Sequence, residues 1–315
     1  FNFKDSTKIC KKKVYYTING ISGINGLEPT INIIPHTKNI AIANKESIIC
    51  GWNFIYRSLT KYKTNFIPID SEHFSIWSLL KYENPNNVKK IYLTASGGPF
   101  LNKKKSEIKN VKAIDAIKHP NWNMGKKISI DSATMMNKIF EIIEAVKIFN
   151  LNINKFEIII HPKSYIHAII QFKTGISKML AHETCMEIPI FNSLYKNNDE
   201  RLYNNKLFDF KILNGLNFIK PDDNKFPCLK LLKYIKIKNT YFEIILVSIN
   251  DELVKKYLND QISFISLQKK LLKFIKHPYF TKYYRKKPNN INDVKIMVEK
   301  VITYLNKNKF YENQL

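Results

Sequence analysis

Four short segments of the chain carry residue types that could do chemistry, and the first is FIPIDSEH, residues 66–73. Two carboxylates follow an apolar run that is typical of a strand. Alternation along a strand would place Asp70 and Glu72 on one side and Ser71 on the other. Ligands gather at the carboxyl ends of strands in open α/β sheets, and carboxylate oxygens suit Mg²⁺ or Mn²⁺. Acidic residues also end strands and cap helices without a ligand, and this motif alone favours that simpler interpretation.

The second segment is ISIDSATMMNKIFEIIEA, residues 128–145, which begins like a strand and continues as an expected helix over residues 132–149. The i, i+3 and i, i+4 relations place on one face of this helix Asn137, Lys138 and Glu141. Ser132 and Thr134 are expected at its first turn, where free N–H groups and the helix dipole favour a phosphate. The alternative is a capped amphipathic helix whose Lys and Glu are solvated.

The third segment is TASGGPF, residues 94–100, a strand followed by a turn of small residues. Two glycines let the backbone approach a ligand closely, and Ser96 adds a hydroxyl group. The segment is therefore a second candidate phosphate site, although ordinary turns use the same residues.

The fourth segment is the polar loop HPNWNMGKK, residues 119–127, which contains two large apolar side chains. Trp122 and Met124 are what we expect in a lid that closes over a ligand and excludes water. They could equally be anchors that hold a long loop against the core.

Hydrophobic patterning predicts the elements that position these segments. Up to about residue 100, short β-like runs (VYYTI, NIAIAN, NFIPI, KIYLTA) alternate with helix-like stretches such as ESIICGWNFIYRSL, which is typical of βαβ units around a mostly parallel sheet. FEIIIHP, AIIQFK and YFEIILVSI are expected as further strands. After Pro227, apolar residues recur every three or four positions, which predicts a small helical domain. The expected fold class is α/β with a helical C-terminal part.

Length and composition exclude several classes of protein. A chain of 315 residues with 44% hydrophobic content can bury a sizeable core, and its length suggests roughly two domains. No apolar run approaches the roughly 18 residues of a membrane span, and the N-terminal residues lack the pattern of a signal peptide. Four cysteines without a CxxC pair argue against a disulfide framework or a zinc ribbon and indicate a reducing compartment.

The net charge of +25 invites a nucleic-acid interpretation, because Lys and Arg neutralise phosphates. Only three of the 51 basic residues are arginines, whereas a base reader is expected to use the arginine fork. The excess of Lys, Asn, Ile, Tyr and Phe is what AT-rich codon usage would generate. We therefore disfavour a nucleic-acid partner and interpret most of the charge as solvated surface; a basic binding module is kept only as a competing hypothesis.

Taken in order, the motifs resemble the 1-deoxy-D-xylulose 5-phosphate reductoisomerase family over almost the whole chain. The matching segments are NGISGINGLEPT (19–30), ANKES (43–47), DSEH (70–73), SGGPF (96–100), HPNWNMGKKISIDSATMMNK (119–138), IHPKSYIH (160–167) and FPCLKL (226–231). The resemblance implies NADPH-dependent rearrangement and reduction of 1-deoxy-D-xylulose 5-phosphate to 2-C-methyl-D-erythritol 4-phosphate in non-mevalonate isoprenoid biosynthesis. It also implies a Mg²⁺ or Mn²⁺ ion, a homodimer, and a bacterial cytoplasmic or plastid-type location.

The resemblance also implies roles for individual residues. The implied metal ligands are Asp70, Glu72 and Glu141. The implied substrate pocket consists of Lys45, Ser71, Glu72, Ser96, His119, Ser132, Asn137, Lys138 and Glu141, with Lys45, Glu72 and His119 catalytic. Asn44, Glu46 and Gly125 are implied contacts of the nicotinamide cofactor, and Trp122 and Met124 fall in the closing loop. His73 and His167 also match family positions, with a functional or a structural role.

The sequence departs from the family pattern in three places. The family's glycine-rich phosphate loop would lie upstream of Asn19, where no such turn occurs. The chain is therefore expected to lack the N-terminal part of an NADPH-binding domain, through truncation or real loss. Ile139 replaces a family glycine, and AHETCMEIPI, residues 181–190, differs from the usual Asp-Met-Arg pattern. These departures keep open a degenerate homologue that binds metal and sugar phosphate without turnover.

The expected domain divisions follow from the same comparison of motifs. Residues 1–69 would be the C-terminal part of a Rossmann-like NADPH-binding domain, and residues 70–195 the catalytic domain that binds metal and substrate. Residues 196–221 would be a linker to a helical C-terminal domain, residues 222–315.

Overall fold

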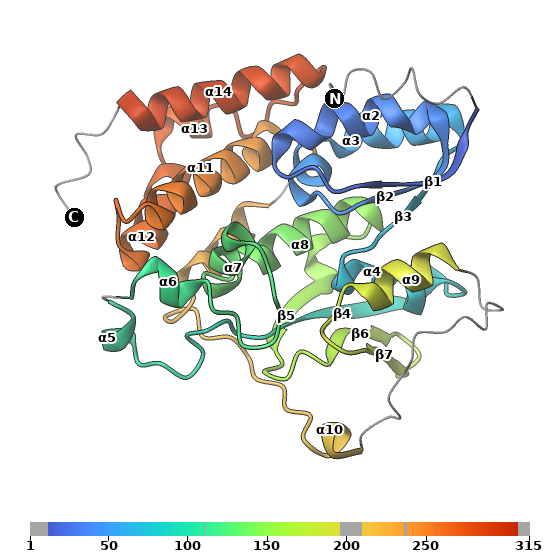
Figure 1. Ribbon diagram of the computed structural model, residues 1–315, viewed down its shortest axis with the longest axis horizontal. Coiled ribbons are helices and arrows are strands. Elements are labelled where there is room, and N and C mark those ends of the chain that lie inside the picture. Colours follow the sequence, from blue (N-terminus) through green and yellow to red (C-terminus); the bar gives the residue numbers. More distant parts are fainter. Residues whose placement is uncertain (1–11, 110, 196–209, 236–237, 308–315) are drawn as a thin grey trace.

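The computed structural model describes residues 12–109, 111–195, 210–235 and 238–307 (Figure 1). These residues form a three-stranded parallel sheet, a four-stranded mixed sheet and a group of C-terminal helices. The expected α/β class with a helical C-terminal part is confirmed. Most of the proposed linker, residues 196–209, lies outside the described residues.

The first sheet has the order β1-β2-β3, and all of its strands are parallel. Its strands are β1 (Val14–Asn19), β2 (Thr37–Ile42) and β3 (Asn65–Ile67). The connections between them are helical: α2 (Leu27–Ile33) lies between β1 and β2, and α3 (Lys45–Tyr62) lies between β2 and β3. Asn44 caps α3 by accepting a hydrogen bond from the Ser47 amide at 2.7 Å. This cap places Lys45 at the carboxyl end of β2.

The second sheet has the order β5-β4-β6-β7, with β4 and β5 parallel and the other pairs antiparallel. Its strands are β4 (Val88–Ala95), β5 (Phe156–Ile160), β6 (Ile166–Phe172) and β7 (Ser177–Ala181). The central strand β4 buries Val88, Ile91 and Leu93 completely. A strand that is buried in this way ends in a fixed position, so the turn that follows it is held firmly.

Residues 126–148 form two helices rather than a strand and one long helix. They are α7 (Lys126–Ala133) and α8 (Met136–Ile148), and between them Met135 has a left-handed backbone with φ 64°. The predicted strand at residues 128–130 is wrong because Ile130 and Ala133 bury one face of a helix. The predicted helix start at Ser132 is also wrong, since α8 begins four residues later. Figure 1 shows α8 in the middle of the molecule.

The C-terminal third is helical, as predicted, but one part of it was expected to be a strand. YFEIILVSI belongs to α11 (Tyr241–Leu258), which begins at a capping box formed by Thr240 and Glu243. The remaining helices are α4 (Ser71–Leu80), α5 (Lys105–Ile108), α6 (Ala113–Ala116), α9 (Glu187–Leu194), α10 (Phe210–Asn214), α12 (Phe264–Ile275), α13 (Pro278–Thr281) and α14 (Ile291–Lys307), with a 3₁₀ helix at Pro227–Tyr234. The helical period of α11 is hidden because nearly every residue of its first three turns is buried, and most of these residues are apolar.

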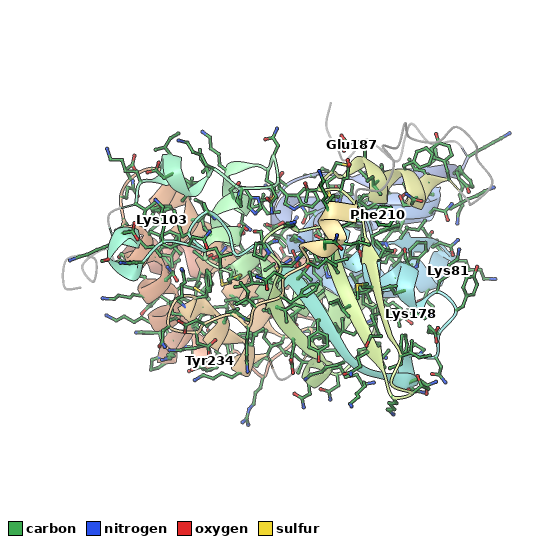
Figure 2. The ribbon with its side chains drawn as sticks, turned by 90° about the horizontal axis from the view of Figure 1, so that it is seen from below. Lys81, Lys103, Lys178, Glu187, Phe210 and Tyr234 are labelled. Atoms are coloured by element: carbon green, nitrogen blue, oxygen red, sulfur yellow. The ribbon has the colours of Figure 1, made fainter. Side chains whose placement is uncertain are left out.

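Lysine side chains are spread over different parts of the surface. In Figure 2, Lys103 lies at the opposite end of the view from Lys81 and Lys178, and all three side chains are exposed. In the described parts of the chain, no helix combines the length and the apolar character that crossing a bilayer requires.

Candidate active site

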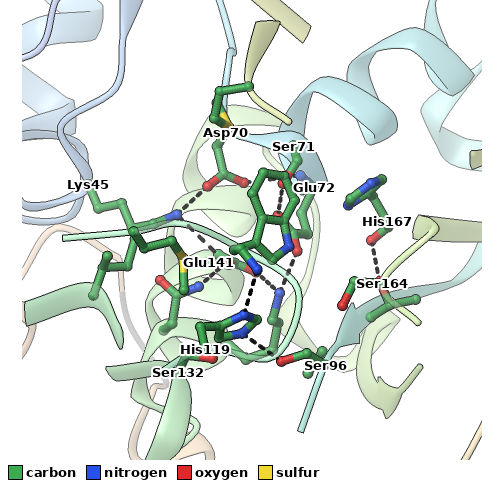
Figure 3. Close-up of a pocket in the computed structure, with 18 of the residues that line it drawn as sticks. Lys45, Asp70, Ser71, Glu72, Ser96, His119, Ser132, Glu141, Ser164 and His167 are labelled. Carbon is green, nitrogen blue, oxygen red and sulfur yellow. Dashed lines mark hydrogen bonds and ion pairs between the residues drawn. The ribbon is translucent and has the colours of Figure 1, made fainter. Parts of the chain in front are cut away.

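A cavity of ≈ 250 Å³ lies where the first turns of α3, α4 and α8 meet the end of β4 (Figure 3). The loop of residues 119–125, here called the lid loop, also lines this cavity. The predicted residues in its wall are Lys45, Asp70, Ser71, Glu72, Ser96, His119, Trp122, Met124, Ser132, Asn137, Lys138 and Glu141. The structure thus brings together Lys45 and residues of all four segments in one cavity.

Asp70 and Glu72 face this cavity from the start of a helix, not from the end of a strand. Strand β3 ends at Ile67, and Asp70 is the N-cap of α4, accepting hydrogen bonds from the amides of Glu72 and His73 at 3.1 and 3.4 Å. The predicted strand alternation is therefore wrong. Even so, Asp70, Glu72 and Glu141 each offer one oxygen atom, and these three atoms lie within 4.8 Å of one another. Asp70 caps a helix and faces the other two carboxylates at once.

Two ammonium groups lie among the carboxylates. Lys45 Nζ contacts Asp70 Oδ2, and Lys138 Nζ lies 2.6 Å from both Glu72 Oε1 and Glu141 Oε2. A fourth carboxylate, Glu144, is also buried here, with Oε2 3.6 Å from Lys45 Nζ. The His73 imidazole, whose Nδ1 lies 3.2 Å from Asp70 Oδ1, adds a third positive charge when it is protonated. Four ionised carboxylates against these groups still leave an excess of at least one negative charge. That excess, with oxygen donors, fits a divalent cation of the Mg²⁺ or Mn²⁺ kind.

Proton affinities in this cluster differ sharply. Burial raises the pKa of Asp70, but the charges of Lys45 and His73 outweigh burial and hold that pKa well below its usual range. Burial, followed by the charge of Glu72, raises the pKa of Glu141 to about 8. Glu141 therefore holds a proton near neutrality unless another positive charge joins the cluster.

The turn after β4 packs directly against the junction of α7 and α8. Gly97 and Gly98 have positive φ angles of 86° and 67°. A Cβ atom on Gly98 would lie 3.0 Å from Ala133 Cα and 3.2 Å from the carbonyl oxygen of Ser132. Ser96 and Ser132, on the two sides of this close approach, both line the cavity. Ser132 occupies the last turn of α7, so the helix start that faces the cavity belongs to Asn137 and Lys138.

Gly98→Ala is expected to lower the free energy of unfolding by about 1–3 kcal/mol, because alanine resists this backbone conformation and its methyl group meets backbone atoms that cannot withdraw. Gly175→Ala is the matched control: φ is 91° there, but nothing lies within 4 Å of the added Cβ. Urea denaturation of both variants separates the two effects. Equal losses for both would contradict the steric contact at Gly98.

His119 is held in one neutral tautomer. Its Nδ1 accepts hydrogen bonds from the amides of Asn121 and Trp122 at 3.2 and 3.0 Å. The proton is therefore on Nε2, which donates to Ser96 Oγ at 2.9 Å. Ser96 Oγ also accepts from the Gly98 amide at 3.0 Å, so its own hydroxyl proton is used in neither of these two hydrogen bonds. Burial, followed by the charge of Lys138, lowers the pKa of His119 to about 4.

We expect His119 to stay neutral throughout the pH range from about 8 down to 5, as measured by NMR titration of the imidazole signals. The unfolded chain binds a proton on this side chain near pH 6.5, and the folded chain does not. The contribution of His119 to the free energy of unfolding is therefore fully present above about pH 6.5, and it is lost as the pH drops toward 4. A titration midpoint at or above 6.5 would show that burial and the charge of Lys138 do not lower the pKa of His119 in the folded chain.

Three predicted cofactor contacts lie beside the cavity and not in its wall. Asn44 caps α3 and donates through Nδ2 to the carbonyl groups of Ile21 and Gly23. Glu46 accepts a hydrogen bond from Lys127 at 2.8 Å, and Gly125 is the N-cap of α7. Asn44 and Gly125 thus cap helices at the edge of the site, and Glu46 forms an ion pair there.

The two further histidines have distinct surroundings. His73 is buried, with Nε2 2.8 Å from the carbonyl oxygen of Glu141 and Nδ1 3.2 Å from Asp70 Oδ1. It connects the start of α4 to α8. His167 lines the cavity and stacks on His182, with ring centroids 3.8 Å apart. Its ring also meets the Trp122 ring edge-on, with centroids 5.9 Å apart, so the lid loop rests on β6.

Several residues in the wall were not predicted. They are Ala43, Ile69, Thr94, Ala95, Asn123, Ile128, Met135, Ser164 and Met186. Ser164 is the polar member with a clear position, because its backbone has φ 53° and its Oγ accepts a hydrogen bond from Asn121 Nδ2 at 2.9 Å. The signal for Ser164 was its place in the turn of IHPKSYIH between two expected strands. Met186 follows the altered Cys185, where sequence reasoning found only divergence.

Family models match three parts of the chain. "1-deoxy-D-xylulose 5-phosphate reductoisomerase" matches residues 4–51, "1-deoxy-D-xylulose 5-phosphate reductoisomerase C-terminal domain" matches residues 66–149, and "DXP reductoisomerase C-terminal domain" matches residues 183–302. Two relatives bear the name 1-deoxy-D-xylulose 5-phosphate reductoisomerase. The protein of Pelagibacter ubique (strain HTCC1062) is 55% identical over 93% of this chain and 76% of its own length. That of Wolbachia pipientis wMel is 41% identical over 83% and 68%.

Two solved structures of reductoisomerases share the fold. The Zymomonas mobilis enzyme in complex with NADPH has a TM-score of 0.84 and 30% identity over 95% of this chain and 76% of that one. A DOX-P reductoisomerase in complex with NADPH, fosmidomycin and magnesium has a TM-score of 0.88 and 29% identity over 99% and 79%. With the carboxylate cluster, the Ser96–His119 pair and the lid loop in one cavity, these matches lead to a single conclusion. The chain belongs to the 1-deoxy-D-xylulose 5-phosphate reductoisomerase family.

Proposed function

We propose that this chain catalyses the NADPH-dependent conversion of 1-deoxy-D-xylulose 5-phosphate to 2-C-methyl-D-erythritol 4-phosphate, a step of non-mevalonate isoprenoid biosynthesis. The observation that carries the proposal is the cluster of Asp70, Glu72 and Glu141, whose oxygen atoms converge within 4.8 Å in a cavity that also holds two lysines. The 55% identity to the Pelagibacter enzyme supports turnover rather than the degenerate alternative.

We propose Asp70, Glu72 and Glu141 as ligands of Mg²⁺ or Mn²⁺. A bound ion would polarise the keto and hydroxyl oxygens of the substrate and stabilise negative charge on them. Lys45 and Ser71 are assigned to the reacting end of the substrate. Lys45 Nζ lies against Asp70, close enough to the ligand set to donate to an oxygen that the ion also holds.

The phosphate end of the substrate is assigned to a second group of residues in the same cavity. Its proposed contacts are Ser96, His119, Ser132, Asn137 and Lys138, which come from the β4 turn, the lid loop and the α7–α8 junction. The Ser96 hydroxyl proton is available to donate to a phosphate oxygen, and Asn137 and Lys138 lie in the first turn of α8. Lys138 also pairs with Glu72 and Glu141, so its one charge is shared between the two ends of the site.

The cofactor side is assigned to Asn44, Glu46 and Gly125, and Trp122 and Met124 are assigned to a lid that excludes water from the reaction. Support comes from the solved neighbours that contain NADPH and from Glu46, which is tied to the base of the lid loop through Lys127.

We extend the proposal to organisation and location. Residues 1–69, 70–195, 196–221 and 222–315 would be the cofactor-binding part, the catalytic domain, a linker and the helical domain. A homodimer in the bacterial cytoplasm or a plastid-type organelle is proposed.

The test is a coupled assay of the purified full chain with substrate, Mn²⁺ and NADPH, followed by the loss of NADPH absorbance. Substrate-dependent consumption of NADPH is expected. If the protein binds Mn²⁺ and sugar phosphate but consumes no NADPH, the degenerate alternative replaces the proposal. A parallel titration with duplex DNA tests the basic-module hypothesis, because binding that persisted at high salt would count against the codon-usage explanation of the charge.

A further inference from the structure

The buried carboxylate of Glu144 stands out because it belongs to the cluster and yet is not one of the three converging ligands. Glu144 lies one turn after Glu141 on the same face of α8, and it is 1% exposed. Its Oε2 has no hydrogen-bond partner among the described residues. Burying a carboxylate oxygen that has no hydrogen-bond partner is costly. The positive group nearest to Glu144 therefore indicates what this side chain does.

That group is the Lys45 ammonium, 3.6 Å from Glu144 Oε2. The same nitrogen contacts Asp70 and lies 3.7 Å from Glu141 Oε1. Lys45 therefore lies among three carboxylates, of which two are proposed metal ligands. The third is Glu144, set behind them on α8.

A cation bound by Asp70 and Glu141 would repel the ammonium that now contacts Asp70. Lys45 begins α3 and is 12% exposed in its side chain, so it cannot simply swing into solvent. Among the described residues, Glu144 is the remaining carboxylate within 4 Å of Lys45 Nζ. Moving the ammonium from Asp70 to Glu144 would free the ligand oxygen and still keep Lys45 in the site.

We propose that Glu144 is a positioning residue, which takes up the Lys45 ammonium when a divalent cation occupies Asp70 and Glu141. The inference rests on the metal site proposed above. Glu144 would affect metal binding by holding Lys45, and not by contacting the metal itself.

A double-mutant cycle on Mn²⁺ affinity tests this action, with free Mn²⁺ measured by electron paramagnetic resonance in the purified full chain without substrate. Glu144→Gln is expected to weaken Mn²⁺ binding about 10-fold, the usual scale for a group that supports a metal ligand. Lys45→Met is expected to strengthen binding, because the competing ammonium is gone. In the Lys45→Met background, Glu144→Gln should change the affinity less than about 3-fold.

The controls separate the possible failures. Glu243→Gln removes another buried carboxylate, on α11, and should leave Mn²⁺ affinity unchanged. If Glu144→Gln does not fold, Glu144→Asp keeps the charge but withdraws it from Lys45, and an intermediate weakening is expected. Equal weakening with and without Lys45 would overturn the inference in favour of a direct effect on the ion. Absence of Mn²⁺ binding by the unaltered protein would overturn the metal site itself.

Discussion

Glu141→Gln is expected to lower kcat/KM by about 10²–10³-fold and to leave the fold at least as stable as before. The amide cannot supply the negative charge that a divalent cation requires, and losing one preorganised electrostatic group costs about this much. The side chain is fully buried in the unaltered protein, where its charged form is costly. An isosteric neutral group avoids that cost.

The effect of Glu141→Gln on stability depends on pH, and the direction of this dependence can be stated. The folded-state pKa of Glu141, about 8, lies above its ordinary value of 4.5. Its contribution to stability is therefore fully present below about pH 4.5 and is lost as the pH rises through 8. The stability advantage of Glu141→Gln over the unaltered chain should grow over that interval, as measured by urea denaturation.

Glu157→Gln is the matched control for Glu141→Gln. Glu157 is a half-exposed carboxylate on β5 that pairs with Lys90 at 2.6 Å. Its loss should change neither kcat/KM nor Mn²⁺ affinity. Unchanged turnover in Glu141→Gln itself would remove Glu141 from the metal site.

Lys147→Met is expected to lower the free energy of unfolding by about 3–5 kcal/mol, a large part of the stability of an ordinary domain. Lys147 Nζ on α8 lies 3.1 Å from Glu243 Oε1 on α11 and donates to the carbonyl oxygen of Ile49 on α3. All three helices are therefore joined at one buried nitrogen. Methionine fills the space but leaves a carboxylate and a carbonyl group without that donor.

Acid should relieve part of this loss. Burial raises the pKa of Glu243, even with Lys147 beside it, and a protonated Glu243 no longer needs a cation. The destabilisation by Lys147→Met should thus be smaller at pH 5 than at pH 8 in urea denaturation. Lys178→Met, which removes an exposed pair with Glu83, should cost less than about 1 kcal/mol. A similarly small cost for Lys147→Met would mean that the buried pair contributes little.

Much of the fold could be predicted because the strands carry ordinary local signals. VYYTI lies in β1, the first four residues of NIAIAN lie in β2, and KIYLTA lies in the buried strand β4. The two glycines after β4 also have the positive φ angles that such a turn requires. In these places local composition and tertiary environment agree.

The errors arose where tertiary packing decides the structure. Met135 has a left-handed backbone, a conformation that methionine does not favour on its own, so the break between α7 and α8 left no mark in the sequence. The first turns of α11 are buried on nearly all sides, which erases the helical period. Asp70 was expected to end a strand, and it caps a helix instead. In each case the residue types were informative, but the backbone geometry could not be predicted from them.

The site residues could be found from motif order, but their pairings could not. The sequence places Lys45 and Glu144 a hundred positions apart, and only the folded chain brings them within 3.6 Å. The same holds for the tautomer of His119, which depends on two amide groups of its own loop. The positions of protons and the partners of charged groups are set only when the chain folds and the cavity forms.

Met135, the left-handed residue between α7 and α8, also fixes how far α8 is rotated about its own axis. Each residue of an α-helix turns the chain by about 100° and advances it by 1.5 Å. Removing or adding one residue at Met135 would therefore turn Glu141, Glu144 and Lys147 together away from their partners, whereas a substitution at that position leaves the count unchanged. At this junction the family should tolerate changes of residue type far more readily than changes of length.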